Sequence, residues 1–288
     1  MKRVVTRVLG SAASGTWGSV TGPAERARLM SIPVKFIDIP VAVRQTPVYR
    51  IVSIERLYEL FENRENVLVS PSRWEDPFEN FILKGQRVSR RGWFGQCWTR
   101  QRASDAMWRI YSSDSRGIRL RSTPERLLTS LGHSITRGRA FIGTVQYLAK
   151  RPLMRFAQKA VTSGTLGDAA EAARTLLVKR PAFRHESEVR FLYRGNITDE
   201  LFKYPIDPHA LIDQLMIDPR MSPAEYEATK AEIRRRAGYA GFIKRSLLYA
   251  PPPSLLGLLD TGSPSNPPSL KPTLGRVVES PRGAAHFV

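Results

Sequence analysis

The stretch that decides the fold reads Phe183-Arg184-His185-Glu186-Ser187-Glu188-Val189-Arg190-Phe191-Leu192-Tyr193. Val, Phe, Leu and Tyr crowd its second half, which is typical of a β-strand. Because side chains alternate along a strand, we expect the carboxylates of Glu186 and Glu188 on one face and Val189 and Phe191 on the other. Such a strand is either a solvated edge or the wall of a polar site.

Around this stretch, the sequence predicts one folded domain between two extensions. Residues 1–45 have a basic start and weak periodicity, and we expect them to be partly disordered. Residues 251–288 are dense in Pro, Ser and Gly, which is typical of a disordered tail. Residues 46–250 are long enough for one large α+β domain, and they show no internal repeat or clear linker.

Strand and helix patterns are mixed along the domain. The expected strands are 48–52, 66–70, 92–99, 117–121, 141–147, 183–193 and 242–249, and the expected helices are 53–61, 105–111, one starting at 124, 167–180 and 223–237. This order is not a strict βαβ alternation. It therefore predicts the α+β class, with a single mixed, mainly antiparallel sheet and flanking helices.

The composition indicates an anionic partner. The net charge is +19, which suits a nucleic acid or a nucleotide, although an Arg-rich genome or simple solubility gives the same charge. A single cysteine, Cys97, excludes an internal disulfide framework and a cysteine-rich zinc site. The histidines lack ligand spacing, so we expect no metal. No apolar run is long enough to span a membrane, and a poor leader pattern favours the cytoplasm. The oligomeric state is left open.

Short clusters follow one another along residues 48–250. They are Tyr49-Arg50, Trp74-Glu75-Asp76-Pro77-Phe78-Glu79, Cys97-Trp98-Thr99, Met107-Trp108-Arg109-Ile110-Tyr111, and Arg184 to Arg190. In this order they resemble the bacterial family catalogued as domain of unknown function 2971. That family name carries no settled activity.

A more distant resemblance is to NAD-dependent ADP-ribosyltransferases, particularly the DNA-modifying toxins of the DarT type. It rests on the Tyr49-Arg50 strand with a helix directly after it, and on Glu188 at the start of a late apolar strand with basic residues before it. The resemblance implies a split-sheet architecture of the ADP-ribosyltransferase kind. It also implies NAD as the substrate and a role as a toxin or phage-defence effector that modifies nucleic acid.

Under that hypothesis the residues take definite roles. Cleavage of the nicotinamide–ribose bond builds oxocarbenium character, which a carboxylate near the ribose stabilises. We assign this role to Glu188, with Glu186 as its partner or as the base that activates the acceptor. The expected NAD-binding residues are Tyr49, Arg50, Trp98, Thr99, Trp108 and Tyr111. The hypothesis requires Arg50, Glu188 and either Trp98 or Thr99 to line one cleft.

Plainer interpretations stay open for the same residues. Glu186 and Glu188 can pair with Arg184 and Arg190 in an exposed network of little energetic weight. The aromatic residues can belong to the core. Two other functions also fit: a non-catalytic nucleic-acid-binding module, and a metal-dependent nuclease. The nuclease would use four acids, Asp76, Glu79, Glu186 and Glu188.

Overall fold

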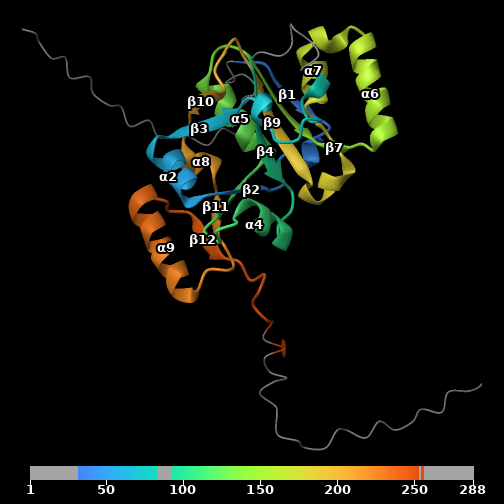
Figure 1. The fold of residues 1–288 in the computed structure, drawn as a ribbon. Helices are drawn as coiled ribbons and strands as arrows, with labels where there is room; N and C mark the ends of the chain where they lie inside the picture. Colours follow the sequence, from blue (N-terminus) through green and yellow to red (C-terminus); the bar gives the residue numbers. More distant parts are fainter. Residues whose placement is uncertain (1–31, 83–91, 253, 256–288) are drawn as a thin grey trace, which may run out of the picture. The chain divides into compact units, whose positions relative to one another are not determined.

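The computed structural model describes residues 32–82, 92–252 and 254–255 (Figure 1). The chain divides into two units. The first unit, Met1–Tyr249, contains every strand and helix named below. The second is Ala250–Val288, and few of its residues are described. The predicted disorder of residues 1–31 and 256–288 therefore lies outside the described residues.

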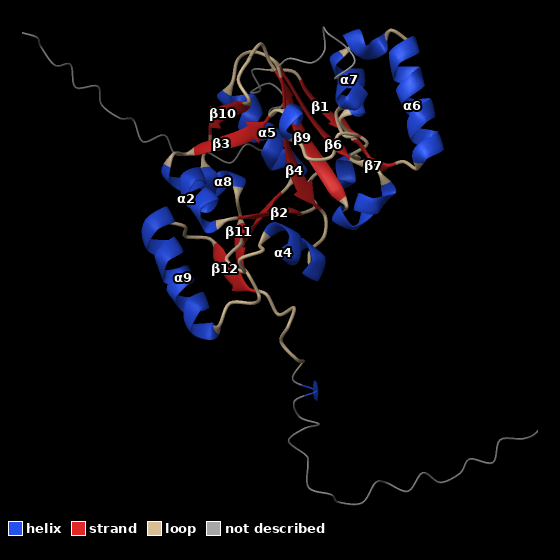
Figure 2. Ribbon diagram, viewed as in Figure 1, coloured by secondary structure: helices blue, strands red, loops and turns tan. Residues whose placement is uncertain are grey.

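Within the described residues, the first unit has twelve strands and seven α-helices (Figure 2). The strands are β1 (Val34–Ile37), β2 (Val48–Val52), β3 (Glu65–Val69), β4 (Trp93–Thr99), β5 (Ile118–Ser122), β6 (Arg139–Thr144), β7 (Gln146–Tyr147), β8 (Val178–Lys179), β9 (Glu188–Arg194), β10 (Leu201–Pro205), β11 (Gln214–Ile217) and β12 (Phe242–Arg245). The helices are α2 (Ile54–Glu62), α4 (Asp105–Tyr111), α5 (Pro124–Ser134), α6 (Lys150–Thr162), α7 (Ala169–Thr175), α8 (Pro208–Leu211) and α9 (Pro223–Ala237). Four 3-10 helices join them: η1 (Val41–Val43), η2 (Pro71–Arg73), η3 (Thr165–Gly167) and η4 (Pro181–Glu186).

Ten of the strands form one sheet in the order β1-β6-β9-β4-β2-β5-β11-β12, and the β3–β10 pair branches from β4. The pairs β1–β6 and β11–β12 are parallel, and the other pairs of this sheet are antiparallel. The predicted class, α+β with one mixed, mainly antiparallel sheet and flanking helices, is confirmed.

The sheet is split along one side of β4. β2 meets β4 through Tyr49 opposite Thr99, and β3 meets it through Val69 opposite Gly95. α2 connects β2 to β3, so the two strands diverge from β4 between these points. On its other side β4 pairs with β9 along its whole length.

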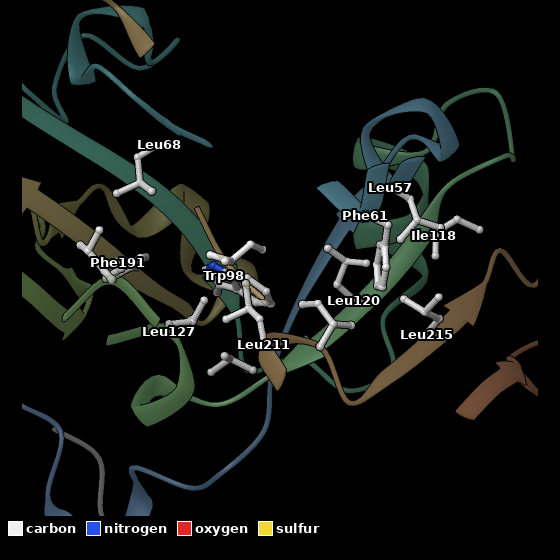
Figure 3. Close-up of a cluster of buried hydrophobic side chains, with 14 of the residues drawn as sticks. Leu57, Phe61, Leu68, Trp98, Ile118, Leu120, Leu127, Phe191, Leu211 and Leu215 are labelled. Atoms are coloured by element: carbon white, nitrogen blue, oxygen red, sulfur yellow. The ribbon is translucent and has the colours of Figure 1, made fainter. Parts of the chain in front are cut away.

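The two faces of the sheet pack against different partners. Val189, Phe191 and Tyr193 of β9 enter the larger hydrophobic cluster, which also takes in buried side chains of α2, α5, α8 and α9. Figure 3 shows ten labelled members of that cluster. Leu192 points the other way, into a smaller cluster with Trp93 and the alanines of α7. The period-two pattern predicted for the second half of the deciding stretch is therefore confirmed.

The first half of that stretch is not a strand. Residues 181–186 form η4, Ser187 adopts the left-handed region with φ of 44°, and β9 begins at Glu188. The prediction of one strand from 183 to 193 was wrong because Pro181 favours a helical start and the turn at Ser187 has no distinct sequence signal. Alternation therefore cannot be the reason why Glu186 and Glu188 come together.

Other boundaries differ from the sequence expectations as well. β1 pairs with β6, so the sheet takes residues from before position 46, where the domain was expected to start. The predicted helix 167–180 is shorter and is followed by β8. Neither α6 nor β10 was predicted.

Candidate functional site

Five charged side chains converge on the α7 face of the sheet, and we call them the ionic cluster: Glu79, Lys179, Glu186, Glu188 and Arg190. All are buried. The Nζ of Lys179 lies 3.0 Å from Glu79 Oε1, 2.5 Å from Glu186 Oε2 and 3.4 Å from Glu188 Oε2. One ammonium thus draws three carboxylates together, from the loop after η2, from η4 and from β9.

Arg190 is the second cation of the cluster, and its side chain has no exposed surface. Its Nε donates to Glu188 Oε1 at 2.6 Å, and its Nη2 donates to Glu188 Oε2 at 3.0 Å and to Glu79 Oε2 at 2.7 Å. Its Nη1 donates to the carbonyl of Leu176, which follows α7, at 2.7 Å. Every guanidinium nitrogen is engaged, so the fork is fixed in one orientation.

Glycine and tryptophan make room for Arg190. Gly95 on β4 lies beside Trp74, whose ring centroid is 4.4 Å from the guanidinium carbon of Arg190. A Cβ on Gly95 would stand 2.7 Å from the Trp74 ring and 3.0 Å from Leu192. The missing side chain at position 95 therefore allows the aromatic lid over Arg190.

Hydrogen bonds from the end of β4 hold the turn that presents Glu186. The Thr99 hydroxyl donates to the carbonyl of Glu186 and accepts from the Gln101 N–H at 2.9 Å. The Arg100 N–H donates to the Ser187 carbonyl at 3.0 Å. Glu186 and Glu188 therefore meet across a left-handed turn fastened to β4, and not across the face of one strand.

The loop after η2 delivers Glu79. Asp76 accepts a hydrogen bond from the Phe78 N–H at 3.0 Å, which is the turn geometry expected of aspartate before proline. Its carboxylate also pairs with Arg180 at 3.2 Å. Asp76 thus orients the loop, and Glu79 at its end reaches the cluster.

The ionic cluster shifts the pKa values of two of its carboxyl groups in opposite directions. Burial alone would raise the pKa of Glu188, but the charge and hydrogen bonds of Arg190 and the charge of Lys179 hold it below its ordinary value. Burial prevails at Glu79 and raises the pKa of that group despite the same two cations. Glu188 therefore stays ionised, and Glu79 takes up a proton more readily. Two carboxyl groups with pKa values pushed apart are suited to acid–base chemistry.

Solvent reaches the sheet beside the cluster. Cys97 is exposed although its neighbours on β4 are buried. Surrounding protein and the charge of Glu188 raise the pKa of its thiol. Tyr111, at the end of α4, is 46% exposed, and its hydroxyl donates to Glu186 Oε1 at 3.2 Å. Tyr111 and Cys97 thus border an open surface that adjoins two of the carboxylates.

The other expected site residues on this face are mostly buried. Tyr49 is 6% exposed, and the guanidinium of Arg119 lies 4.4 Å from its ring centroid. Thr99 is buried with its hydroxyl engaged as described. Trp108, on α4, is 2% exposed. Of the predicted NAD-binding residues, Tyr111 is the one that combines exposure with a contact to a carboxylate.

Arg50 and Trp98 lie elsewhere. Thr99 is opposite both Tyr49 and Glu188, so these three share a face, and their neighbours Arg50 and Trp98 occupy the other. Both line a cavity that does not include Glu188. The single cleft lined by Arg50 and Glu188 is therefore not formed, and Arg190 supplies the guanidinium that holds Glu188.

Sequence reasoning missed Lys179 as a member of the cluster because the residue lay inside a predicted helix. Its ammonium stands between the carboxylates that the nuclease hypothesis assigned to metal. In the described ranges, no group of three or more His, Cys, Asp or Glu has an arrangement that could hold a metal ion. Asp76, the fourth acid of that hypothesis, pairs with Arg180 instead.

Among the described residues, none of the helices has the length and apolar character needed to cross a membrane. No protein-family model matches the chain, so its resemblance to family 2971 remains a prediction. No curated protein matches it either.

Solved structures of DarT from Thermus sp. 2.9 are similar to the chain at low identity. The complex with NAD+ has a TM-score of 0.36 and 14% identity, and the match covers 70% of this chain and 96% of that one. The complex with ADP-ribosylated ssDNA also has a TM-score of 0.36 and 14% identity, with 73% and 96% covered. Likeness at this level assigns no role to any residue of this chain.

Proposed function

We propose that the chain is an NAD-consuming ADP-ribosyltransferase-like enzyme whose acceptor is a nucleic acid. The proposal differs from the sequence hypothesis in one requirement: the site lies on the face of the ionic cluster, where Arg190, and not Arg50, holds Glu188. The observation that carries the proposal is the ionic cluster beside the exposed Tyr111 and Cys97. Burying five charges is expensive, and an apolar core of the same volume is often more stable. A buried network that adjoins an accessible surface and spreads its carboxyl pKa values is typical of a catalytic site.

The reaction places distinct demands on the carboxylates. The bond between nicotinamide and ribose C1 breaks, and its electron pair leaves with nicotinamide, which departs uncharged. The proposal assigns the ionised Glu188 to the positive charge that develops at the ribose. An acceptor oxygen or nitrogen then bonds to C1 and loses a proton. Glu186, which accepts the hydrogen bond of the Tyr111 hydroxyl, is the proposed base.

The structure offers less support to the alternatives. The Lys179 ammonium occupies the space between the carboxylates that a nuclease would give to its metal. A module that only binds nucleic acid needs positive charge and exposed aromatic rings, and it has no use for three converging carboxylates. The basic composition supports nucleic acid as the acceptor rather than as the only ligand.

The first experiment measures nicotinamide release from NAD+ by the full chain, with and without single-stranded DNA or RNA. We expect release by the wild type, increased by one nucleic acid, and a loss of about 100-fold or more in Glu188→Gln. Thermal unfolding of each variant separates lost chemistry from lost structure.

Glu188→Gln removes a partner of two buried cations and can fail to fold, so a second variant is needed. Tyr111→Phe removes one hydroxyl, which donates to Glu186, from a half-exposed residue, and it should keep the fold while it slows the reaction. Glu59→Gln, an exposed residue of α2, is the matched control and should change nothing. No nicotinamide release by the folded wild type under any of these conditions would rule the proposal out.

A further inference from the structure

A cavity of about 390 Å³ lies on the face of the sheet opposite the ionic cluster. It occupies the split beside β4, between α2, β2 and β3. Trp98, Leu120 and Leu211 line its depth and are each less than 5% exposed (Figure 3). Arg56 and Lys203, at its rim, are exposed. An apolar floor, an open rim and this volume are typical of small-molecule sites.

Arg50 is the charged residue of this cavity that lacks a partner. At the rim, Arg56 pairs with Glu59 at 2.5 Å, and Lys203 lies 4.0 Å from Glu65. Within the described parts of the chain, the Arg50 side chain has no hydrogen bond or ion pair. The surrounding protein lowers the pKa of Arg50, as expected for a half-buried guanidinium. A half-buried guanidinium without an anion is an unfavourable arrangement that an anionic ligand would relieve.

The polar side chains in the depth of the cavity are already satisfied by one another. The Trp98 indole donates to Gln96 Oε1, Gln96 Nε2 donates to Asn66 Oδ1, and Asn66 Nδ2 donates to the Tyr204 hydroxyl, each at 2.8 Å. This chain of hydrogen bonds fixes the indole ring in place. It leaves Arg50 as the group through which the cavity can recognise charge.

We propose that this cavity binds a small amphipathic carboxylate. The fork of Arg50 matches a carboxylate with two parallel hydrogen bonds, and the apolar body lies on Trp98, Leu120 and Leu211. A single unpaired guanidinium suits one negative charge, whereas a polyphosphate needs several cations. The site lies on the face opposite Glu188, so it is separate from the proposed NAD site and does not depend on it.

The test compares two probes of the same shape, 1-naphthoate and the neutral 1-naphthamide, by calorimetric titration of the full chain. We expect naphthoate to bind at least tenfold more tightly than the amide. Arg50→Gln should remove that preference, and Arg50→Lys should keep part of it. Arg235→Gln, which alters an exposed arginine of α9 that pairs with Glu232 and does not line the cavity, is the matched control and should bind as the wild type does.

A stability measurement distinguishes binding from a structural role for Arg50. Because the charge lacks a partner, Arg50→Met should raise the Tm of the free protein, and naphthoate should raise the Tm of the wild type but not of the variant. Equal binding of acid and amide, or unchanged naphthoate binding by Arg50→Gln, would overturn the proposal. Displacement of naphthoate by NAD+ would also overturn it, because the cavity would then belong to the NAD site.

Discussion

At the scale of single residues, Arg190 binds two carboxylates of the ionic cluster. It is fully buried and shared by Glu188 and Glu79. Arg190→Met would leave these carboxylates with Lys179 as the remaining cation of the cluster, and we expect a loss of about 3–5 kcal/mol in the free energy of unfolding. Urea unfolding measures this. Arg56→Met, which breaks an exposed pair on α2, should have little effect. Similar small losses in both variants would contradict the buried network.

Cys97 gives a second prediction at this scale. Its thiol is accessible, but the raised pKa leaves little thiolate at neutral pH, and thiolate is the reactive form. We expect iodoacetamide to modify Cys97 at least about tenfold more slowly in the folded chain than in the urea-unfolded chain. Glu188→Gln should speed the reaction, since the charge of Glu188 contributes to the raised pKa. Equal rates in folded and unfolded chains would contradict the assignment.

At the scale of elements, the packing of η2 and its following loop on β4 depends on position 95. A Cβ there would meet the Trp74 ring, so Gly95→Ala should displace Trp74 from Arg190 and lower both stability and any NAD turnover. Tryptophan fluorescence reports the displacement. Gly167→Ala is the matched control, because no atom lies within 4 Å of the added Cβ. A wild-type emission spectrum in Gly95→Ala would show that Trp74 does not depend on the glycine.

The elements also show which parts of the fold could be predicted from the sequence. Ser53 caps α2, and the apolar periodicity of α2 matches the structure. The strands predicted at 92–99 and in the second half of the deciding stretch are found as β4 and β9. β1 was missed because its strand signal is short and its pairing partner, β6, is about a hundred residues away. Lys179 could not be placed in the site for a related reason. Its role depends on the meeting of three separate elements, which no local pattern encodes.

The position of Arg50 shows why local sequence could not predict which residues share the site. Tyr49 and Arg50 are adjacent in the sequence, and neighbouring positions on a strand face opposite ways. A motif of two residues therefore spans both faces of the sheet. Only the pairing of Tyr49 with Thr99 decides which of the two shares a face with Glu188.

At the scale of the whole molecule, stability should depend on pH in two opposite ways around the ordinary carboxyl pKa of 4.5. The folded pKa of Glu188 is lowered, so its contribution is complete above 4.5 and is lost as the pH falls below it. The folded pKa of Glu79 is raised, so its contribution is present below 4.5 and is lost as the pH rises above it.

Urea unfolding from about pH 3 to about pH 7 tests this dependence. Glu188→Gln should flatten the acid side of the stability profile, and Glu79→Gln should flatten the part just above 4.5. The same profile in the wild type and both variants would show that the two groups titrate normally.

The charge of the whole chain leads to a prediction about its partner. A net charge of +19 should make binding to single-stranded DNA or RNA strongly dependent on salt, because bound cations release counterions from the phosphates. We expect the affinity to fall at least about tenfold between roughly 50 mM and roughly 200 mM salt, as measured by fluorescence anisotropy. Binding that does not change with salt would speak against phosphate contacts.

The alternation along β4 restricts how this sequence can evolve. Gln96 and Trp98 serve the cavity, while Cys97 and Thr99 serve the opposite face. Inserting or deleting one residue in β4 would exchange the two sets and place an indole in the ionic cluster. Substitutions can therefore adjust either face separately, but changes of length at this position would damage both at once. Natural variation in length should accumulate in the loops and spare this strand.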